Sequence, residues 1–465
     1  MVDSTNLKKL IESKRHFTLL DGSKIHCNPC CSTFRVSKNA QKYCVESHER
    51  GGRHKTNLAK WNRCRQIPTK ENLAQPMKNE FYSDIAELFT TANVPLDKLN
   101  YPIFDRFFAR WCGKNCPDPS TLRKSYLEPL YDDAIQRIRK DIDNHWIYLQ
   151  IDEARICDRN IYLIVVGKLD GCPSQPFLLD CKEIPESANN VSATQAIVDA
   201  LKILWPEKIL YDNLRLLLSD QAAYMIRAGE NLKRGLFPHL LHVTCLCHGL
   251  SRVCEETRIA YPKVERVITY LTNVLARAPR RVALLEEITN CKVQSFPVAT
   301  RWGTYVKFCR FVYVNFESIL QFTERILDED CASIGLLLSW INEEKTRDDL
   351  RQIMELQKLP EAIAKLETRN LTIHEQKKLV DEVREALPER FVQKLDSSLM
   401  KNPDYAQIFS LTGAQKRKFE YAPLTSVEVE RLFSQLKGIV NDQRNRLSEV
   451  SVKRLAIVYC NSNKV

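Results

Sequence analysis

Apolar runs of strand length follow one another through the middle of the chain. The first three runs, interrupted by polar turns, are HWIYLQID (145–152), NIYLIVVGK (160–168) and PFLLDCK (176–182). Helical spacing of apolar residues then covers 192–205 and 221–235, and two further strand-length runs cover 213–220 and 240–246. The pattern predicts three strands, a helix, a strand, a helix and a last strand.

The predicted order β-β-β-α-β-α-β is that of the ribonuclease-H-like fold. Short turns between the first three strands favour antiparallel pairing. The later crossovers through helices imply parallel neighbours, with helices covering the faces of the sheet. We therefore predict an α/β core over 144–258.

Helical spacing dominates on both sides of this core. In the N-terminal region 79–143 we predict three helical stretches, and Ser120 is placed to be the N-cap of the last one. After the core, helical patterns such as those of 264–288 and 375–395 predict an all-α block over 259–415. Two amphipathic helices are predicted in 416–465.

The N-terminal segment 1–65 has the spacing of a metal-binding module. Cys27 and Cys30 form a C-x2-C pair, and His48 and His54 follow in an H-x5-H arrangement. Two thiolates and two imidazoles suit a closed tetrahedral zinc site. Because so short a segment cannot build a sufficient core, Zn2+ would supply much of its folding free energy.

Two features leave the ligand set open. Cys31 and Cys44 are additional thiols in the same segment, so the four ligands could be permuted. Gly51 and Gly52 interrupt the helix that would hold both histidines. The alternative is that the cysteines are simply unpaired buried thiols. The polar, proline-bearing stretch 66–78 is predicted to be a linker.

The charge of the chain is concentrated near its N-terminus. The net charge is +11, and residues 1–78 contain 16 Lys/Arg against 6 Asp/Glu, so the remainder is nearly neutral. A basic arm on a neutral body indicates binding to a phosphate backbone. A solvated basic tail is the alternative.

Composition and cysteine use favour a globular intracellular protein. The chain is 44% apolar and 27% charged and has 465 residues, enough for several domains. No apolar run is long enough to span a bilayer and no secretory signal is recognisable, so we expect a soluble protein without a membrane partner. The 17 cysteines are then expected to be reduced thiols.

Two aspartates follow apolar runs that are predicted to be adjacent strands. Asp152 ends the first predicted strand and Asp220 ends the fourth. Open α/β sheets place their sites in the crevice beyond such strand ends. Two carboxylates meeting there repel each other and need a cation, for which Mg2+ is suited. Taken alone, Asp220 is better explained as a helix N-cap, and only its pairing with Asp152 favours a metal ligand.

One long segment of the predicted core reads LLLSDQAAYMIRAGENLKRGLFPHLLHVTCLCHGLSRVCEE. It resembles the core of hAT-superfamily DNA transposases, in the lineage that includes the CGG triplet-repeat-binding proteins. The C-x2-H of that family corresponds to Cys245 and His248, and its R-W pair to Arg301 and Trp302 in PVATRWGTY. Its S-x-x-E-R-x-F-S helix corresponds to SVEVERLFS, which contains Glu430. The resemblance extends from about residue 80 to the end, and the segment in front resembles a BED-type zinc finger.

The resemblance implies a DDE triad of Asp152, Asp220 and Glu430 that binds Mg2+. It also implies that the helical block is inserted between the second aspartate and the glutamate. The predicted fold class is thus an α/β ribonuclease-H-like core interrupted by a large all-α insertion, with a small N-terminal zinc finger. Glu428 competes for the role of third acid, but it lies about 200° around the helix from Glu430, so only one can face the site.

Further roles in DNA binding are implied by the same resemblance. Trp302, beside Arg301, would stack on an extruded base, although it could instead be a core residue of the insertion. His248 would contact a phosphate or the scissile strand. His248 and Cys245 could equally be structural residues at the start of a helix.

The implied function is Mg2+-dependent DNA cleavage and strand transfer at transposon ends in the nucleus, with double-stranded DNA as partner. The alternative is a domesticated, transposase-derived nuclear protein that binds DNA and regulates RNA polymerase II transcription without catalysis. An interaction protein built on a helical scaffold is a third hypothesis, which the basic finger disfavours. The resemblance further suggests a homodimer or higher oligomer formed through the tail helices. The apolar faces of these helices could instead pack on the protein's own core; they contain Phe433, Leu436, Ile439, Val440 and Leu455.

Overall fold

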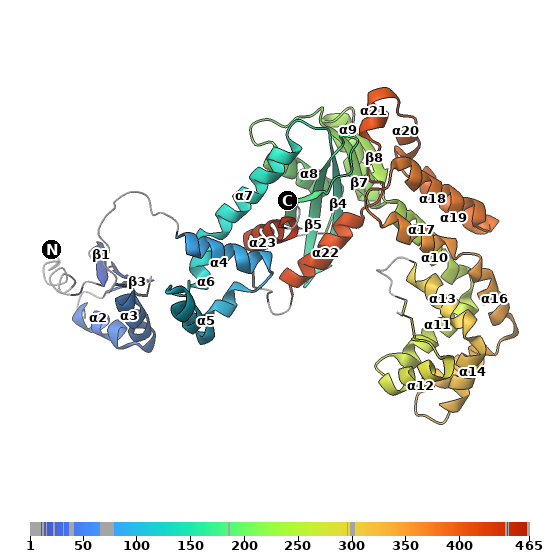
Figure 1. Ribbon diagram of the computed structural model, residues 1–465, viewed down its shortest axis with the longest axis horizontal. Coiled ribbons are helices and arrows are strands. Elements are labelled where there is room, and N and C mark those ends of the chain that lie inside the picture. Colours follow the sequence, from blue (N-terminus) through green and yellow to red (C-terminus); the bar gives the residue numbers. More distant parts are fainter. Residues whose placement is uncertain are drawn as a thin grey trace. The chain divides into compact units, whose positions relative to one another are not determined.

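The computed structural model in Figure 1 divides into two compact units, Met1–Lys78 and Asn79–Val465. It describes residues 11, 14, 16–21, 24–30, 32–36, 41–65, 79–184, 187–294, 296–297, 303–441, 444 and 446–462. Each unit has a buried apolar core of its own. Among the helices described, none combines the length and the apolar character that crossing a bilayer requires.

The N-terminal unit is a small antiparallel sheet followed by two helices. The strands are β1 (Phe17–Asp21), β2 (Lys24–Cys27) and β3 (Ser32–Arg35), and the helices are α2 (Gln41–Arg50) and α3 (Gly52–Arg65). The sheet order is β1-β2-β3. The helical run is interrupted at Gly51, as the paired glycines predict. The break lets the two histidines come from separate helices.

The second unit begins with helices. They are α4 (Glu80–Thr91), η1 (Leu96–Asn100), α5 (Pro102–Phe107), η2 (Phe108–Cys112), α6 (Pro119–Ser125) and α7 (Leu127–Ile142). The prediction of Ser120 as an N-cap is wrong. The cap of α6 is Asp118, whose side chain accepts a hydrogen bond from the Thr121 N–H at 2.9 Å. Pro119 after this cap suits the first helical position, where an N–H is not needed.

The five-stranded mixed sheet confirms the predicted ribonuclease-H-like order. The strands are β4 (Ile147–Ile156), β5 (Arg159–Lys168), β6 (Phe177–Ile184), β7 (Leu214–Ser219) and β8 (Leu241–Thr244). They are arranged β6-β5-β4-β7-β8. The β4–β5 and β5–β6 pairs are antiparallel, and the β4–β7 and β7–β8 pairs are parallel. The crossover helices are α8 (Asn190–Leu204) and α9 (Ala223–Gly235).

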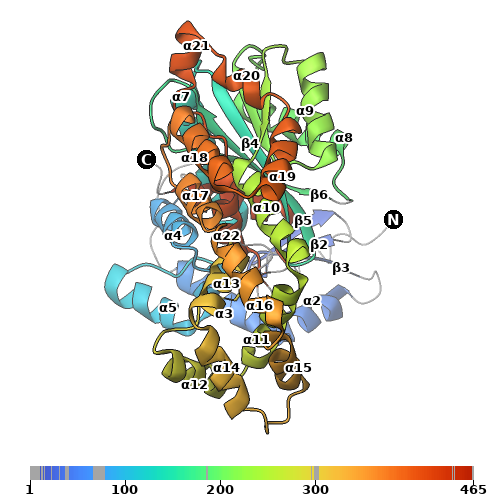
Figure 2. The same ribbon diagram turned by 90° about the vertical axis from the view of Figure 1, so that its right-hand side faces the viewer.

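Alternate residues of the central strand β4 face two different cores. Ile147, Leu149 and Ile151 belong to a core shared with α7, α8 and the C-terminal helices α22 (Val427–Ile439) and α23 (Glu449–Asn461). Tyr148, on the other face, belongs to the core of the helical block. Gln150 and Asp152 lie on the same face as Tyr148 and contact Thr425 and Glu430, so the start of α22 lies on that face together with part of the inserted block. Figure 1 shows the order of these elements, and Figure 2 shows α17, α18 and α19 of the inserted block in front of the sheet.

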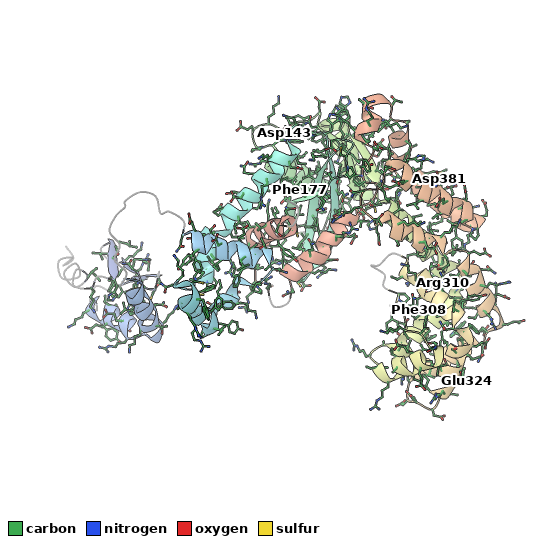
Figure 3. All side chains as sticks on the ribbon, viewed as in Figure 1. Asp143, Phe177, Phe308, Arg310, Glu324 and Asp381 are labelled. Carbon is green, nitrogen blue, oxygen red and sulfur yellow. The ribbon has the colours of Figure 1, made fainter. Side chains whose placement is uncertain are left out.

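The block that follows the sheet is entirely helical in the residues described. Its helices are α10 (Leu246–Ala260), α11 (Pro262–Leu275), α12 (Pro279–Thr289), α13 (Thr304–Val314), α14 (Phe316–Arg325), α15 (Ala332–Ile341), α16 (Glu344–Met354), α17 (Lys358–Leu366), α18 (Ile373–Ala386), α19 (Glu389–Met400), α20 (Tyr405–Phe409) and α21 (Gly413–Lys418). Figure 3 labels Phe308 and Arg310 on α13, of which the first is buried and the second exposed.

Two helical patterns of this block are shorter in the structure than their spacing suggests. The stretch 264–288 forms two helices, because Arg277 adopts a left-handed conformation (φ 55°) just before Pro279. The stretch 375–395 also forms two helices, which meet at Pro388. A proline ends a helix because it lacks an N–H and restricts the residue before it.

The C-terminal helices pack on the protein's own sheet. Phe433, Leu436, Ile439 and Val440 are each at most 4% exposed and belong to the sheet core, and Leu455 packs against it. These side chains are therefore not a free surface for a partner. Oligomerisation stays a prediction.

Candidate metal centres

The predicted zinc ligands converge in the N-terminal unit. Cys27 ends β2, Cys30 lies in the following turn, His48 is in α2 and His54 is in α3. One ligand atom from each lies within 4.8 Å of all the others. Nδ1 of His54 is 3.3 Å from Sγ of Cys27 and 3.4 Å from Sγ of Cys30. Tetrahedral zinc with ordinary Zn–S and Zn–N bonds separates such atoms by about 3.5 Å, so the cluster fits a zinc site.

Two aromatic rings pack against the two histidines. The sequence alone does not indicate these contacts. The ring of Phe17 stacks on His54 at 5.8 Å, and the ring of Phe34 stacks on His48 at 4.6 Å. Burial lowers the pKa of both histidines, and the charge of the neighbouring His16 lowers each of them further, against the opposing charge of Glu49. A neutral imidazole is the form that binds a metal. Phe17 and Phe34 lie in strands, where their spacing gave no signal of a contact with the histidines.

The question of the extra cysteines is settled for one of them. Cys44 lies in α2, packs against the core of the N-terminal unit and is not one of the four clustered residues. Cys31 lies outside the described residues.

The first predicted acid has a different position in its strand from the one expected. Asp152 does not end the strand, because β4 continues to Ile156. The long antiparallel pairing with β5 supports this extension. However, the parallel pairing with β7 ends at Gln150 and Leu218. Asp152 therefore lies just past the β4–β7 ladder, at the predicted edge of the sheet, and is 7% exposed.

The second predicted acid directly follows β7. Continuing the β4–β7 register by two residues from Gln150 and Leu218 leads to Asp152 and Asp220. Oδ1 of Asp220 accepts a hydrogen bond from the Ala222 N–H at 3.1 Å. The N-cap of α9 is Ala222, so Asp220 holds the turn before the helix rather than capping it. Asp220 is not part of the cluster described next, although its charge acts on Asp152.

Glu430 comes to the sheet from the far end of the sequence. One ligand atom each of Asp152, His248 and Glu430 lies within 4.8 Å of the others. Nε2 of His248 is 3.9 Å from Oε1 of Glu430. His248, expected as a DNA contact, is thus a possible third ligand together with the two acids. The sequence alone does not show whether His248 contacts DNA or binds a metal ion.

Glu428, the competing acid, points elsewhere. Its carboxylate accepts two hydrogen bonds from Arg369, at 2.7 and 3.0 Å, and one from Arg431. Burial alone would raise the pKa of Glu428, but these two guanidinium groups lower it. The glutamate is therefore neutralised by arginines, as a structural ion pair.

Contacts at the start of α22 explain how Glu430 reaches the sheet. Ser426 donates its N–H to Sγ of Cys245 at 3.2 Å, and Leu246 donates its N–H to O of Leu424 at 2.9 Å. Gln150 of β4 donates to O of Thr425 at 3.3 Å. The chain before α22 is thus held against both β4 and the start of α10. Glu430 lies in the first turn of the helix that follows.

The electrostatics at Asp152 are those of crowded acids. Burial raises the pKa of Asp152 to about 8, and the charges of Glu430 and Asp220 add to this increase. Burial also raises the pKa of Glu430. A site in which carboxylates are desolvated and close together favours a bound cation.

His248 supplies positive charge in the same place. Burial alone would lower the pKa of His248, but the negative charge and the hydrogen bond of the Cys245 sulfur and the carboxylates of Asp152 and Glu430 raise it to about 9. Burial by itself would raise the pKa of Cys245, yet hydrogen bonds from Cys247 and the charge of His248 bring it well below the usual value. Cys245 and His248 therefore shift each other's pKa in opposite directions next to the acids.

The donor set could hold a divalent cation. Two carboxylates suit Mg2+, and an imidazole beside them also suits Mn2+.

Arg301 and Trp302, the predicted DNA contacts, lie outside the described residues. Comparison with profiles of known protein families and with curated proteins finds no match to this chain.

Proposed function

We propose that the protein is a hAT-like DNA transposase that cleaves and joins DNA at transposon ends. The observation that supports this most strongly is the convergence of Asp152 and Glu430, which are 278 positions apart (430 − 152), beside a ribonuclease-H-like sheet. The helical block between β4 and α22 separates Asp152 and Glu430 in the sequence, but the two residues still lie close together in space. The resemblance of the surrounding motifs to hAT transposases points to the same activity.

Each residue of the cluster has a defined part in the proposed reaction. Asp152 and Glu430 would hold Mg2+, with Asp220 at the edge of the same crevice. Two Mg2+ ions bound there would supply the activation of a water molecule and the stabilisation of the leaving 3′-oxygen in an in-line displacement at phosphorus. His248 would place positive charge beside the scissile phosphate. Cys245 would keep α22, and thus Glu430, in place.

The basic finger supports DNA as the substrate. Its cluster of thiols and imidazoles would fold a short segment rich in Lys and Arg, which can neutralise phosphates. We propose that this unit brings the enzyme to DNA in the nucleus. The acidic cluster would act on that DNA.

Cleavage of DNA that contains the terminal inverted repeats of the element encoding the chain tests the proposal. The full-length protein, with Mg2+ or Mn2+, is expected to release the repeat ends, and Asp152→Asn or Glu430→Gln to lower the rate by about a hundredfold or more. Glu153→Gln is the matched control. Its side chain accepts a hydrogen bond from Tyr224 at 3.0 Å and is not in the cluster, so cleavage should continue.

A non-catalytic DNA-binding regulator is the second candidate. The observation that favours it is His248, whose raised pKa gives Asp152 and Glu430 a cationic partner without any metal. In that case the fold would be retained as a scaffold, and DNA binding would influence RNA polymerase II transcription. Binding of the repeats without cleavage under either metal would support this candidate and exclude the transposase.

A further inference from the structure

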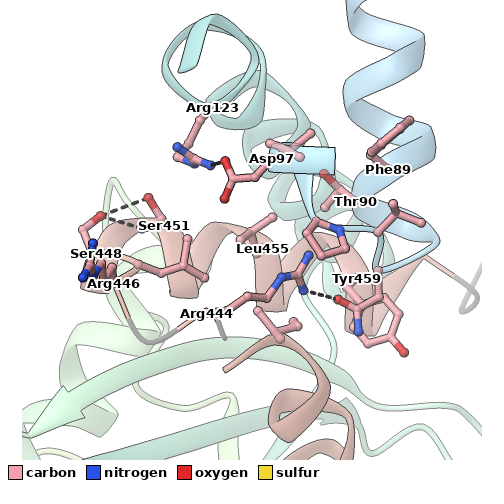
Figure 4. Close-up of a pocket in the computed structure, with 16 residues that line it drawn as sticks. Phe89, Thr90, Asp97, Arg123, Arg444, Arg446, Ser448, Ser451, Leu455 and Tyr459 are labelled. Atoms are coloured by element: carbon pink, nitrogen blue, oxygen red, sulfur yellow. Dashed lines mark hydrogen bonds and ion pairs between the residues drawn. The ribbon is translucent and has the colours of Figure 1, made fainter. Parts of the chain in front are cut away.

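A separate cavity of about 690 Å³ lies between the N-terminal helices of the second unit and the C-terminal helices. Figure 4 shows its lining, which comes from α4, η1 and α6 on one side and from the end of α22, the segment that follows it and α23 on the other. This volume is within the range of pockets that bind small molecules. None of the proposed metal ligands lines it.

One wall of this cavity is basic. Three arginines line it, Arg123, Arg444 and Arg446, against one acid, Asp97. Asp97 is already paired with Arg123 at 2.9 Å. Within the described part of the chain, no carboxylate forms an ion pair with Arg444 or Arg446. The wall therefore keeps a surplus of two positive charges (three arginines minus one aspartate).

The position of Arg444 is held from inside the cavity. Its Nη1 donates to Oδ1 of Asn93 at 2.8 Å. Burial lowers the pKa of Arg444, the negative charge of Asp97 opposes this change, and the positive charge of Arg123 adds to it. A partly desolvated guanidinium that is not in direct contact with a carboxylate is a strong donor for an anion, above all for a phosphate, which matches its forked geometry.

The start of α23 adds to the positive potential at this wall. Ser448 is the N-cap of this helix and accepts a hydrogen bond from the Ser451 N–H at 3.3 Å. Both serines line the cavity. The N-terminus of a helix favours negative charge, so it acts in the same direction as the arginines.

The remaining wall is apolar and partly aromatic. Phe89, Val94 and Leu455 line it, together with the ring of Tyr459. A ligand that fits both walls has a flat or apolar group joined to a phosphate. A nucleotide has this combination, because its base stacks on aromatic surface while its phosphate binds to arginine.

We propose that this cavity binds a nucleotide unit, with its phosphate at Arg444 and Arg446 and its base against the apolar wall. The unit is either a free nucleotide or a nucleotide of a DNA strand. The cavity is linked to the acidic cluster by α22, which has Glu430 in its first turn and Ile439 at the cavity. Nine residues of helix separate them by about 14 Å along the axis.

Photochemical crosslinking with peptide mapping tests this proposal in the full-length protein. The probes are 8-azidoadenosine 5′-monophosphate and a single-stranded 12-mer DNA that contains one 5-iodouracil, both without added Mg2+. We expect crosslinks in the peptides that contain Phe89 or Tyr459. Arg446→Ala, an exposed site, and Arg444→Ala should each lower the crosslink yield about tenfold or more. Arg137→Ala, an exposed arginine on α7, is the matched control and should leave it unchanged.

The outcomes separate the two sources of the nucleotide. Arginine-dependent crosslinks from the free nucleotide identify a small-molecule site, whereas such crosslinks from the DNA probe alone identify a contact with a strand. Absence of crosslinks in these peptides from both probes, or crosslinks that persist in the folded Arg446→Ala variant, would overturn the proposal. Glu430→Gln should crosslink normally, so the result does not depend on whether the acidic cluster is catalytic.

Discussion

His242 illustrates how a single buried side chain supports the edge of the sheet. Its Nε2 is 2.9 Å from Oγ of Ser219, which itself donates to O of Asp220 at 2.8 Å. The serine hydrogen is therefore used, and we assign Nε2 of His242 as the donor. On the other side, Gly229 leaves room for the ring, since a Cβ there would lie 2.1 Å from Nδ1. Burial lowers the pKa of His242 to about 4.

This lowered pKa predicts a loss of stability in acid. Above pH 6.5 the imidazole is neutral in both the folded and the unfolded protein, so it has no effect. Between pH 6.5 and about 4 only the unfolded state takes up the proton, which lowers the free energy of unfolding by about 3 kcal/mol in total. Urea unfolding of the wild type and of His242→Gln at pH 7.5, 5.5 and 4.5 measures this. The free energy of unfolding of the wild type should fall more steeply with decreasing pH than that of the variant. A difference between the two proteins that is the same at all three pH values would contradict the lowered pKa of His242.

Residue identity at the candidate site was largely predictable, but residue partners were not. Asp152 and Glu430 were identified from strand ends and from a motif, and the structure brings both together with His248. Which of Glu428 and Glu430 faces the sheet depends on Arg369, which lies 59 positions before Glu428. Such a contact leaves no local pattern in the sequence.

Among the elements, the segment between α21 and α22 determines whether the third acid reaches the sheet. Gln376 of α18 holds this segment with both ends of its amide. Its Nε2 donates to O of Ala422 at 3.0 Å, and its Oε1 accepts from the Leu424 N–H at 2.9 Å. Gln376 is 3% exposed, so water cannot replace these bonds.

Replacing this glutamine should therefore be costly. Gln376→Leu leaves the Leu424 N–H and the Ala422 carbonyl buried without a partner, and we expect the free energy of unfolding to fall by about 2–4 kcal/mol. Gln393→Leu, at an exposed position of α19, should change it by less than about 0.5 kcal/mol. Chemical unfolding of both variants compares them, and equal effects would show that the amide does not hold the segment.

The order of the strands and helices was predictable because hydrophobic periodicity is local. The breaks within helices were less so, since they depend on single residues such as Pro279, Pro388 and the left-handed Arg277. The extent of β4 beyond Asp152 depends on pairing with β5. Hydrophobic periodicity within one segment does not show how far β4 and β5 pair.

At the scale of the whole molecule, the two units do not share a core, which implies two separate folding units. The N-terminal unit has a small core and the cluster of two cysteines and two histidines, whereas the second unit has the five-stranded sheet and most of the helices. Zinc binding would then contribute to the stability of the first unit only.

Removal of zinc should therefore unfold one unit and spare the other. We expect a zinc chelator to abolish the protection from hydrogen exchange in 16–65 and to weaken DNA binding, while 79–462 keeps its protection. Cys27→Ser should have the same effect, and Cys44→Ser, which is outside the cluster, should not. DNA binding that survives chelation unchanged would contradict the role of the N-terminal unit.

The proposed function depends most on a divalent cation bound between the carboxylates of Asp152 and Glu430. Anomalous diffraction from crystals grown with Mn2+, recorded on both sides of the manganese absorption edge, tests it directly. We predict a manganese peak about 2.1–2.2 Å from carboxylate oxygens of Asp152 and Glu430, and its loss in Glu430→Gln. A wild-type crystal without manganese at these carboxylates, in which the imidazole of His248 fills the space between them, would contradict the claim that this is a catalytic metal centre.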